Sequence, residues 1–117
     1  MDDVLYAIYE DLIHRHTTPS TLLEAGCGTA YLSRTFSQAG YTVTAFDNNE
    51  RMLTVASYIA GTLNQNISLL KHDITTPFLG TYRTIIMPID VINHLPTLMS
   101  VNNALTNINH ALEPKGI

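Results

Sequence analysis

The sequence predicts a single α/β domain in which parallel strands alternate with helices. A short apolar run, Thr21–Ala25, ends at two glycines, Gly26 and Gly28, and a helix-like pattern follows at once. A parallel strand turns tightly into a helix in this way beside a ligand. Further strand-like runs stand at residues 41–46 and 67–70. With 117 residues, of which 45% are hydrophobic, the chain suits one compact domain.

The composition argues against several classes of protein. The net charge is −4 and the six basic residues are scattered along the sequence, which predicts no basic patch for nucleic acid. No apolar run reaches the roughly 18 residues of a membrane span. The single cysteine, Cys27, forms no intrachain disulfide, and the N-terminus is acidic where a signal peptide would be basic. We therefore expect a cytoplasmic protein without membrane or nucleic-acid partners.

The segment Asp2–His16 predicts a helix, because its apolar residues recur at spacings of three and four. This helix either packs on the sheet alone or also brings Tyr6 or Tyr9 to a ligand. The sequence then breaks at residues 17–20, which include a proline.

The glycine turn after the first strand is the candidate site. Gly26 supplies a backbone conformation closed to residues with a Cβ atom, and Gly28 leaves no side chain between the main chain and a ligand. The helix predicted over residues 29–39 points its free N–H groups at whatever lies over the glycines. Gly40 is well placed to end that helix.

This turn resembles motif I of the class I S-adenosylmethionine-dependent methyltransferases, an acid followed by Gly-x-Gly-x-Gly. Glu24 and the two glycines fit, and Ala30 stands at the third glycine. The third glycine mainly lets helix and strand approach closely, so one methyl group should be tolerated there. The resemblance covers nearly the whole chain from Thr21, since later family landmarks occur in order. They are Asp47, His72-Asp73-Ile74, Asp90 to Leu95, and Leu112-Glu113-Pro114-Lys115-Gly116.

The resemblance implies a Rossmann-like, three-layer αβα fold with parallel strands in the order 3-2-1-4. Only these four strands of the family's seven-stranded sheet have a counterpart here, so residues 1–117 form an incomplete methyltransferase-like domain. Strand four would leave an exposed apolar edge, which natural proteins normally cover. We expect a second copy or a partner chain on that edge, or a longer protein of which this is a piece.

Asp47 follows the second strand and stands 19 residues beyond Gly28. Dinucleotide-type folds place an acid on the ribose hydroxyls at an interval of roughly 20 residues, and a carboxylate can accept from both hydroxyls. The alternative is a cap for the next helix. Because Asn48 and Asn49 can also cap that helix, we favour the ligand role for Asp47.

The helix that begins near Glu50 is predicted to bury one apolar face. Met52 in its first turn either belongs to the core or covers one face of an adenine ring. The members of the expected buried face are Met52, Ala56, Ile59 and Leu63.

The resemblance implies that Asp73 accepts a hydrogen bond from the adenine amino group and that Ile74 packs on the ring. The alternative for Asp73 is an exposed loop acid, and His72 is expected to face solvent. Residues 82–89 predict the fourth strand, in which Pro88 suits only the end or an edge. The family usually has an acid where Arg83 stands, which is a second departure.

The segment after strand four would face the reactive end of the cofactor. Asp90 could bind the methionyl ammonium or orient the methyl acceptor, and His94 could take a proton from it. The alternative is that residues 93 and 94 only brace the loop. The last helix begins at Pro96-Thr97 with an Asn-rich face expected in solvent and an apolar stripe of Leu98, Val101, Leu105, Ile108 and Leu112.

The resemblance implies transfer of a methyl group from S-adenosylmethionine to a small-molecule acceptor, with S-adenosylhomocysteine as product. The alternative is a catalytically incompetent cofactor-binding or assembly module. An oxidoreductase fragment is disfavoured, because Tyr31 stands where a nicotinamide motif has glycine. No zinc cluster is evident. The residues expected to hold the cofactor are Glu24, Gly26, Cys27, Gly28, Asp47, Asn48, Met52, Asp73, Ile74 and Asp90, and those expected to act in catalysis are Asp90 and His94.

Overall fold

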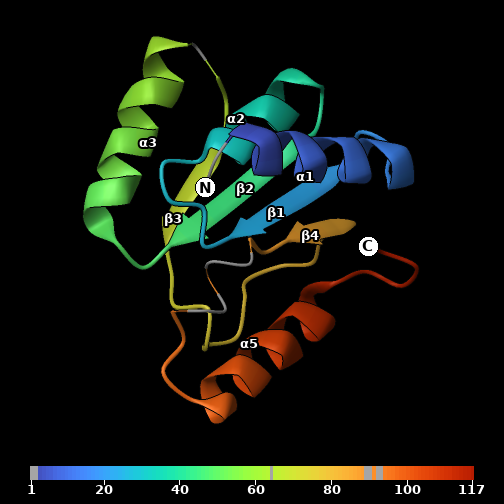
Figure 1. Ribbon diagram of the computed structural model, residues 1–117, viewed down its shortest axis with the longest axis vertical. Helices are drawn as coiled ribbons and strands as arrows, with labels where there is room; N and C mark the ends of the chain where they lie inside the picture. Colours follow the sequence, from blue (N-terminus) through green and yellow to red (C-terminus); the bar gives the residue numbers. More distant parts are fainter. Residues whose placement is uncertain (1–2, 64, 89–90, 92–93) are drawn as a thin grey trace.

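The computed structural model describes residues 3–63, 65–88, 91 and 94–117. Strands and helices alternate along most of this length (Figure 1). None of the described helices is long and apolar enough to cross a membrane. In chain order the elements are α1 (Asp3–His16), β1 (Thr21–Ala25), α2 (Tyr31–Gln38), β2 (Thr42–Asp47), α3 (Glu50–Thr62), β3 (Ser68–Lys71), β4 (Thr84–Ile86) and α5 (Leu98–Ala111).

The four strands form one sheet in the order β3-β2-β1-β4, and every pairing is parallel, as predicted. Leu23 in β1 lies opposite Thr44 in β2 on one side and Ile85 in β4 on the other. Because parallel strands end at the same edge of the sheet, the segments that follow β1, β2 and β3 meet there. This edge positions the candidate site.

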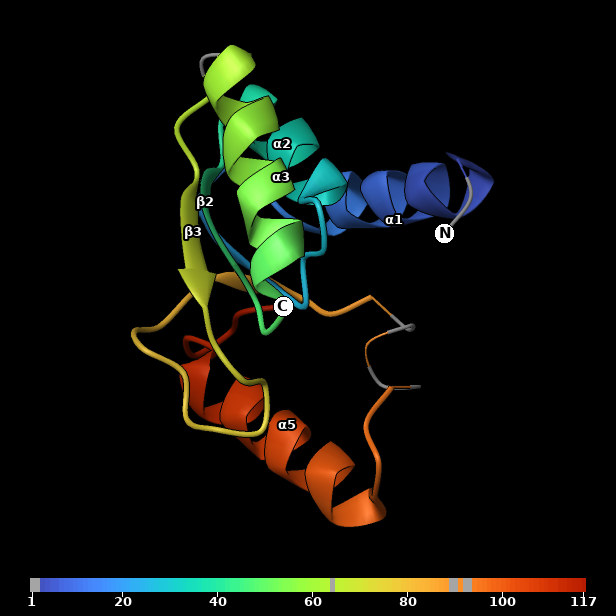
Figure 2. The same cartoon turned by 90° about the vertical axis from the view of Figure 1, so that its left-hand side faces the viewer.

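Helices cover both faces of the sheet (Figures 1 and 2). Successive side chains of a strand point to opposite faces. Leu22 accordingly joins a cluster with Phe36 of α2, while Leu23 joins a cluster with Ala104 of α5. Helices α1, α2 and α3 therefore share one face and α5 takes the other, which confirms the three-layer prediction.

Helix α3 does not bury the face that its spacing predicted. Ala56 and Ala60 are buried, whereas Met52 and Leu63 are exposed and Ile59 is only half-buried. Small residues let the helix axis lie close to the strands, so the contact is made by Ala56 against Ala45 of the sheet. The prediction that Met52 and Leu63 are buried is wrong.

The apolar stripe predicted for α5 is wrong at two of its five residues, while Val101, Ile108 and Leu112 are half-buried. The buried residues are Ala104, Asn107 and Ala111, while Leu98 is 83% exposed and Leu105 is 48% exposed. The Asn107 side chain donates a hydrogen bond of 3.1 Å to the carbonyl oxygen of Ile74. One side of the Asn-rich surface is thus inside the molecule, because it satisfies a buried carbonyl group there.

Strand β4 is shorter than the predicted residues 82–89, and its outer edge is partly covered. Ile117 donates its N–H to the Arg83 carbonyl at 2.9 Å, and Ile85 donates its N–H to the Ile117 carbonyl at 2.8 Å. These two bonds are the pattern of a further parallel strand. Pro88 lies beyond the strand, as its missing N–H requires.

Candidate functional site

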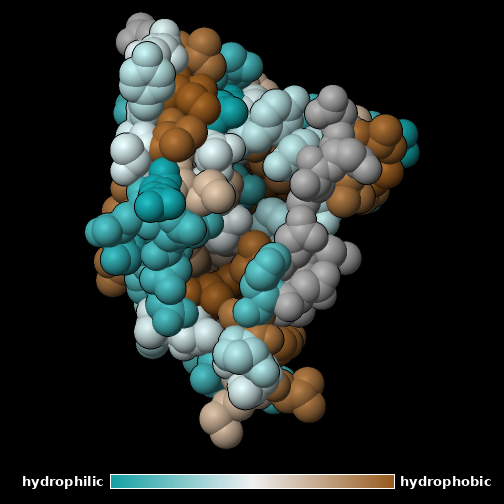
Figure 3. All heavy atoms as spheres, turned by 60° about the vertical axis from the view of Figure 1, so that its left-hand side comes forward, coloured by the Kyte–Doolittle hydropathy of each residue, from teal (hydrophilic) through white to brown (hydrophobic). Residues whose placement is uncertain are grey.

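A cavity of about 670 Å³ opens at the carboxyl ends of β1, β2 and β3 and is bounded on another side by the chain that follows β4. Figure 3 shows this face hollowed, with hydrophobic side chains inside the hollow and hydrophilic ones along one side. Every cofactor residue expected from the sequence except Asp90 lines the cavity, and so does His94. Asp90 lies outside the described residues.

The turn after β1 leaves room for a ligand at one glycine only. Gly26 has a φ of +77°, and a Cβ atom added there would lie 2.4 Å from Cγ2 of Val91. Gly28 has a φ of +55°, and an added Cβ would meet nothing within 4 Å. Gly26 is therefore required by packing and backbone conformation, while the space over Gly28 is open to the cavity.

Ala30 differs from its expected role. It is buried, and its φ of 66° places it in the left-handed region just before α2. Its N–H donates to the Cys27 carbonyl at 2.8 Å, which closes the turn. The glycine that the motif has at this position would suit the backbone conformation as well as the close packing. The sequence interpretation named only the packing.

Asp47 joins the end of β2 to the glycine turn. Its Oδ2 accepts the Gly28 N–H at 2.8 Å, and its Oδ1 accepts the Asn49 N–H at 2.8 Å. The helix cap is instead Asn49, whose side chain accepts from the N–H groups of Arg51 and Met52. Asp47 therefore does not cap the helix by accepting bonds from its first turn.

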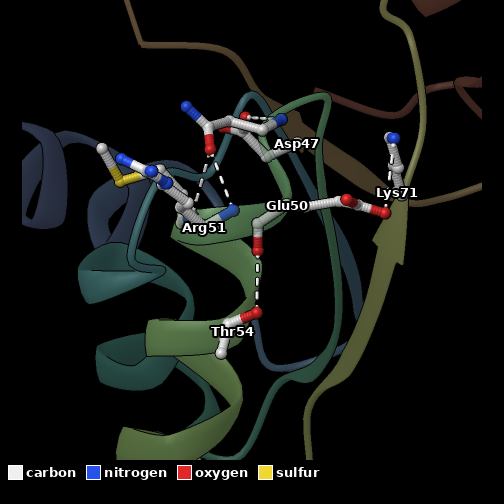
Figure 4. Close-up of polar contacts among 7 residues, drawn as sticks. Asp47, Glu50, Arg51, Thr54 and Lys71 are labelled. Atoms are coloured by element: carbon white, nitrogen blue, oxygen red, sulfur yellow. Dashed lines mark hydrogen bonds and ion pairs between the residues drawn. The ribbon is translucent and has the colours of Figure 1, made fainter.

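The first turn of α3, whose polar contacts are drawn in Figure 4, forms one wall of the cavity. Asn49 and Met52 both line it, so the exposed Met52 side chain borders the space beside Asp47. On the side toward β3, Lys71 reaches Glu50 with an N–O distance of 3.5 Å. Both side chains are exposed, so this ion pair between α3 and the end of β3 adds little stability.

Glu24 is almost fully buried between β1 and α2. Its Oε1 accepts the Ser33 hydroxyl at 2.7 Å and the Ser33 N–H at 3.3 Å. Burial raises the pKa of Glu24 to about 7 against the lowering effect of these bonds, and the nearby Asp47 carboxylate raises it further. Glu24 thus fixes the start of α2 to β1 and also borders the cavity.

Cys27 lines the cavity but has the properties of a neutral thiol. Burial, followed by the negative charges of Glu24 and Asp47, raises the pKa of Cys27 to about 12. The thiolate is the nucleophilic form of cysteine. Because the thiol stays protonated near neutral pH, Cys27 is unsuited to covalent catalysis.

Asp73 follows β3 and is exposed at the cavity. Its Oδ1 accepts the Thr75 N–H at 2.8 Å and the Thr75 hydroxyl at 2.7 Å. These bonds lower the pKa of Asp73, with the backbone bond contributing most. Asp73 is therefore an ionised acceptor at neutral pH, and the adjacent Ile74 is a buried apolar wall.

His72 does not face solvent as predicted. It is half-buried and lines the cavity, with its ring centre 5.0 Å from that of Phe46 and 5.9 Å from that of Phe78. The residue follows β3, whose neighbour β2 contains Phe46 one residue before its end, and edge-on contact with the aromatic rings holds the imidazole inward. One strand pattern cannot show such a contact across the sheet.

Aromatic residues of α1 and α2 complete the wall above the glycine turn. Tyr6 lines the cavity, and its ring centre lies 4.6 Å from that of Tyr31, over which Arg34 stands at 5.9 Å. Of the two tyrosines proposed from sequence, Tyr6 is at the cavity and Tyr9 packs against the core. Tyr31 and Phe46 also line it and were not predicted, although each stands beside a motif residue.

Comparisons with known proteins agree with this architecture. The chain is 30% identical over 98 residues to the putative methyltransferase YqeM of Bacillus subtilis (strain 168). This alignment covers 82% of the chain and 39% of that protein. An S-adenosylmethionine-dependent methyltransferase from Clostridium acetobutylicum superposes with a TM-score of 0.86 at 18% identity, covering 99% of this chain and 48% of that one. CalS10, an amino pentose methyltransferase from Micromonospora echinaspora, superposes with a TM-score of 0.83 at 23% identity. This superposition covers 97% of this chain and 47% of CalS10.

The chain spans about half of each of these proteins, or less. The two superpositions therefore show a shared fold over this part of their length. A match to the methyltransferase domain family runs over residues 22–116, almost all of the chain after α1. On this evidence the chain belongs to the methyltransferase domain family.

Proposed function

We propose that this chain is the cofactor-binding part of an S-adenosylmethionine-dependent methyltransferase that acts on a small-molecule acceptor. The observation that carries the proposal is the open space over Gly28, which lines the cavity and donates its N–H to the carboxylate of Asp47 in the same lining. Ligands of open α/β sheets bind at this edge, outside the carboxyl ends of the strands. A cavity of about 670 Å³ is in the range of sites for cofactors.

The two carboxylates at the strand ends would select the nucleoside. A carboxylate has about four acceptor positions, and Asp47 uses two of them for Gly28 and Asn49. The remaining two can accept both ribose hydroxyls, while the existing bonds hold the carboxylate in place. Asp73, whose lowered pKa keeps it ionised, would accept from the adenine amino group. Ile74 and Met52 would provide apolar contact for the ring.

When bound, S-adenosylmethionine supplies a methyl group on an already activated sulfonium. The chain then has to position an acceptor and exclude water, which needs no covalent nucleophile. The protonated thiol of Cys27 agrees with this requirement. His94 lines the same cavity and would take a proton from the acceptor, and Asp90 is proposed to bind the methionyl ammonium or orient the acceptor.

We also propose that the outer edge of β4 is paired along more of its length in the working protein, by a second copy or another chain. The two bonds made by Ile117 show that this edge accepts a parallel strand. A cytoplasmic location fits the free, buried thiol of Cys27. Light scattering after size exclusion tests the pairing, since a monomer that keeps full cofactor affinity would contradict it.

The cofactor proposal is tested by calorimetric titration with S-adenosylhomocysteine. Asp47→Asn removes the charge with little change in shape, and we expect affinity to fall by about tenfold or more, because hydrogen bonds to charged groups contribute about 1.5–3 kcal/mol. Asp11→Asn makes the same chemical change on the exposed surface of α1 and should leave affinity within about twofold. A folded wild-type chain that shows no saturable binding, or equal losses in both variants, would refute the assignment.

A further inference from the structure

A second cleft, of about 290 Å³, lies at the other end of the strands. It is lined by the end of α1 and the residues after it (15–18), by Arg83 and Thr84 where β4 begins, and by Lys115 and Ile117. The cavity of the candidate site lies at the carboxyl ends of the strands and shares none of these residues. The two spaces are therefore separate.

The fold gathers positive charge at this cleft. Arg15, Arg83 and Lys115 line it, which is half of the six lysines and arginines that are scattered along the sequence. Arg15 pairs with Asp11 at 3.0 Å. Within the described part of the chain, Arg83 and Lys115 form no ion pair with a carboxylate. Two uncompensated cations thus border a concave space in a protein of net charge −4.

Thr84 supplies an independent sign of a missing partner. Its side chain is 1% exposed and lines the cleft, and its hydroxyl has no hydrogen-bond partner among the described residues. A buried hydroxyl without a partner costs about 1–3 kcal/mol. Such groups are rare in folded proteins and call for an explanation, for which a bound acceptor oxygen is sufficient.

The turn that carries Lys115 is fixed against β4. Lys115 has a φ of 65°, a conformation that residues other than glycine seldom adopt. A Cβ atom on the neighbouring Gly116 would lie 2.7 Å from the Arg83 carbonyl oxygen, so the two backbones are in close contact. Gly116 also donates its N–H to the Glu113 carbonyl at 2.8 Å. The backbone therefore fixes the turn that contains Lys115 against the Arg83 carbonyl group.

We propose that this cleft binds the phosphate group of a small molecule. A guanidinium group fits two phosphate oxygens at once and an ammonium group adds a point charge. The Thr84 hydroxyl would donate to a further oxygen. The site is independent of the cofactor proposal, because it uses no residue of the cavity.

Titration with inorganic phosphate at constant ionic strength, followed by amide chemical shifts, tests the proposal. We expect saturable binding whose shifts centre on residues 83–85 and 115–117, and weaker binding of acetate, which carries less charge. The double change Arg83→Gln and Lys115→Gln should weaken phosphate binding by about tenfold or more, the equivalent of about 1.4 kcal/mol. Thr84→Val keeps the shape, removes the donor and should weaken binding severalfold.

Arg51→Gln is the matched control, because Arg51 is an exposed arginine of α3 and lines neither space. It should leave phosphate affinity within about twofold. Shifts that grow linearly without saturation, equal binding of acetate, or equal losses in Arg51→Gln and the double variant would each overturn the proposal. Unchanged amide chemical shifts of the double variant away from the cleft would show that the chain is folded, whatever the phosphate result.

Discussion

The half of the molecule built from β1, α2 and β2 differs from the half built from β4 and α5 in how tightly it is packed. In β1 every residue except Thr21 is buried, and the chain that follows is tied to β2 by the Asp47 carboxylate. In the other half, β4 has three residues, and Leu98 and Met99 of α5 are 83% and 73% exposed. The first half determines the shape of the cavity, and the second contributes one wall.

The two halves also differ in their buried polar contacts. On the β1 side, Glu24 holds Ser33 with two hydrogen bonds. On the α5 side, Asn107 holds the carbonyl group of Ile74, which comes from the segment after β3. Since Ile74 lines the cavity, this amide connects α5 to the site, beside the packing of Ala104 in the same cluster as Ile74. Substitutions in the first half should therefore be the more damaging ones.

The largest effect is expected for Gly26→Ala. The new Cβ would lie 2.4 Å from Val91, and the φ of +77° adds backbone strain. We expect a loss of about 2–4 kcal/mol in the free energy of unfolding, from overpacking and the left-handed conformation together. Gly28→Ala has the same kind of φ but open space, so urea denaturation should show a loss of only about 1 kcal/mol. Equal losses would contradict the difference drawn between the two glycines.

The next effect depends on pH and concerns Glu24. Its pKa is raised to about 7 in the folded state by burial, so the folded chain holds a proton that the unfolded chain has already released. The stabilisation from this proton is complete below the unfolded pKa of about 4.5 and is lost as pH rises through about 7. Stability should fall across this window by up to about 1.4 kcal/mol per pH unit.

Glu24→Gln should remove this slope, because an amide does not titrate. The measurement is urea denaturation at several pH values, with the difference between wild type and variant plotted against pH. Glu50→Gln, on the exposed side chain of α3, serves as control and should parallel the wild type. If the stability of Glu24→Gln changes with pH as the stability of the wild type does, Glu24 does not carry the proton.

A smaller loss is expected for Asn107→Ala in the α5 half. The change leaves the Ile74 carbonyl group without its donor, which should cost about 1–2 kcal/mol. Asn103→Ala, at an exposed residue one turn earlier in the same helix, should change stability by less than about 0.5 kcal/mol. Thermal denaturation distinguishes the two, and a neutral Asn107→Ala would mean that α5 is not anchored through this amide.

The sequence predicts the tightly packed half well because local patterns decide it. The boundaries of β1 match the prediction, since a run of apolar residues ended by glycine has one arrangement in a parallel sheet. The strand order came from the family resemblance and is confirmed. The cavity contains the predicted residues that the structure describes because most of them stand at or just after strand ends, and Met52 begins the helix that follows β2.

Contacts between elements are what the sequence could not supply. The spacing of apolar residues in α5 is consistent with more than one helix face, and only the approach of Ile74 shows why Asn107 is inside. His72 turns inward because its ring contacts those of Phe46 and Phe78, which lie in other segments of the chain. The gathering of Arg15, Arg83 and Lys115 likewise depends on where the chain returns to β4.

The smallest effect, and the most specific, is expected for Ala30→Gly. Glycine would relieve the strain of a φ of 66°, which costs alanine about 1–2 kcal/mol. The loss of a buried methyl group would cost about 0.8 kcal/mol of stability. The greater conformational freedom of glycine in the unfolded state would cost about 0.4–1 kcal/mol more. These contributions nearly cancel, so stability should change by less than about 1 kcal/mol.

Ala45→Gly makes the same chemical change at a buried position of β2 where the backbone is extended. No strain is relieved there, so its loss should be about 1–2 kcal/mol, from the methyl group and the added freedom alone. Urea denaturation of the two variants side by side isolates the backbone contribution. If Ala30→Gly costs as much as Ala45→Gly, the left-handed turn at Ala30 is not strained, and the third motif position would matter only for packing, as the sequence first suggested.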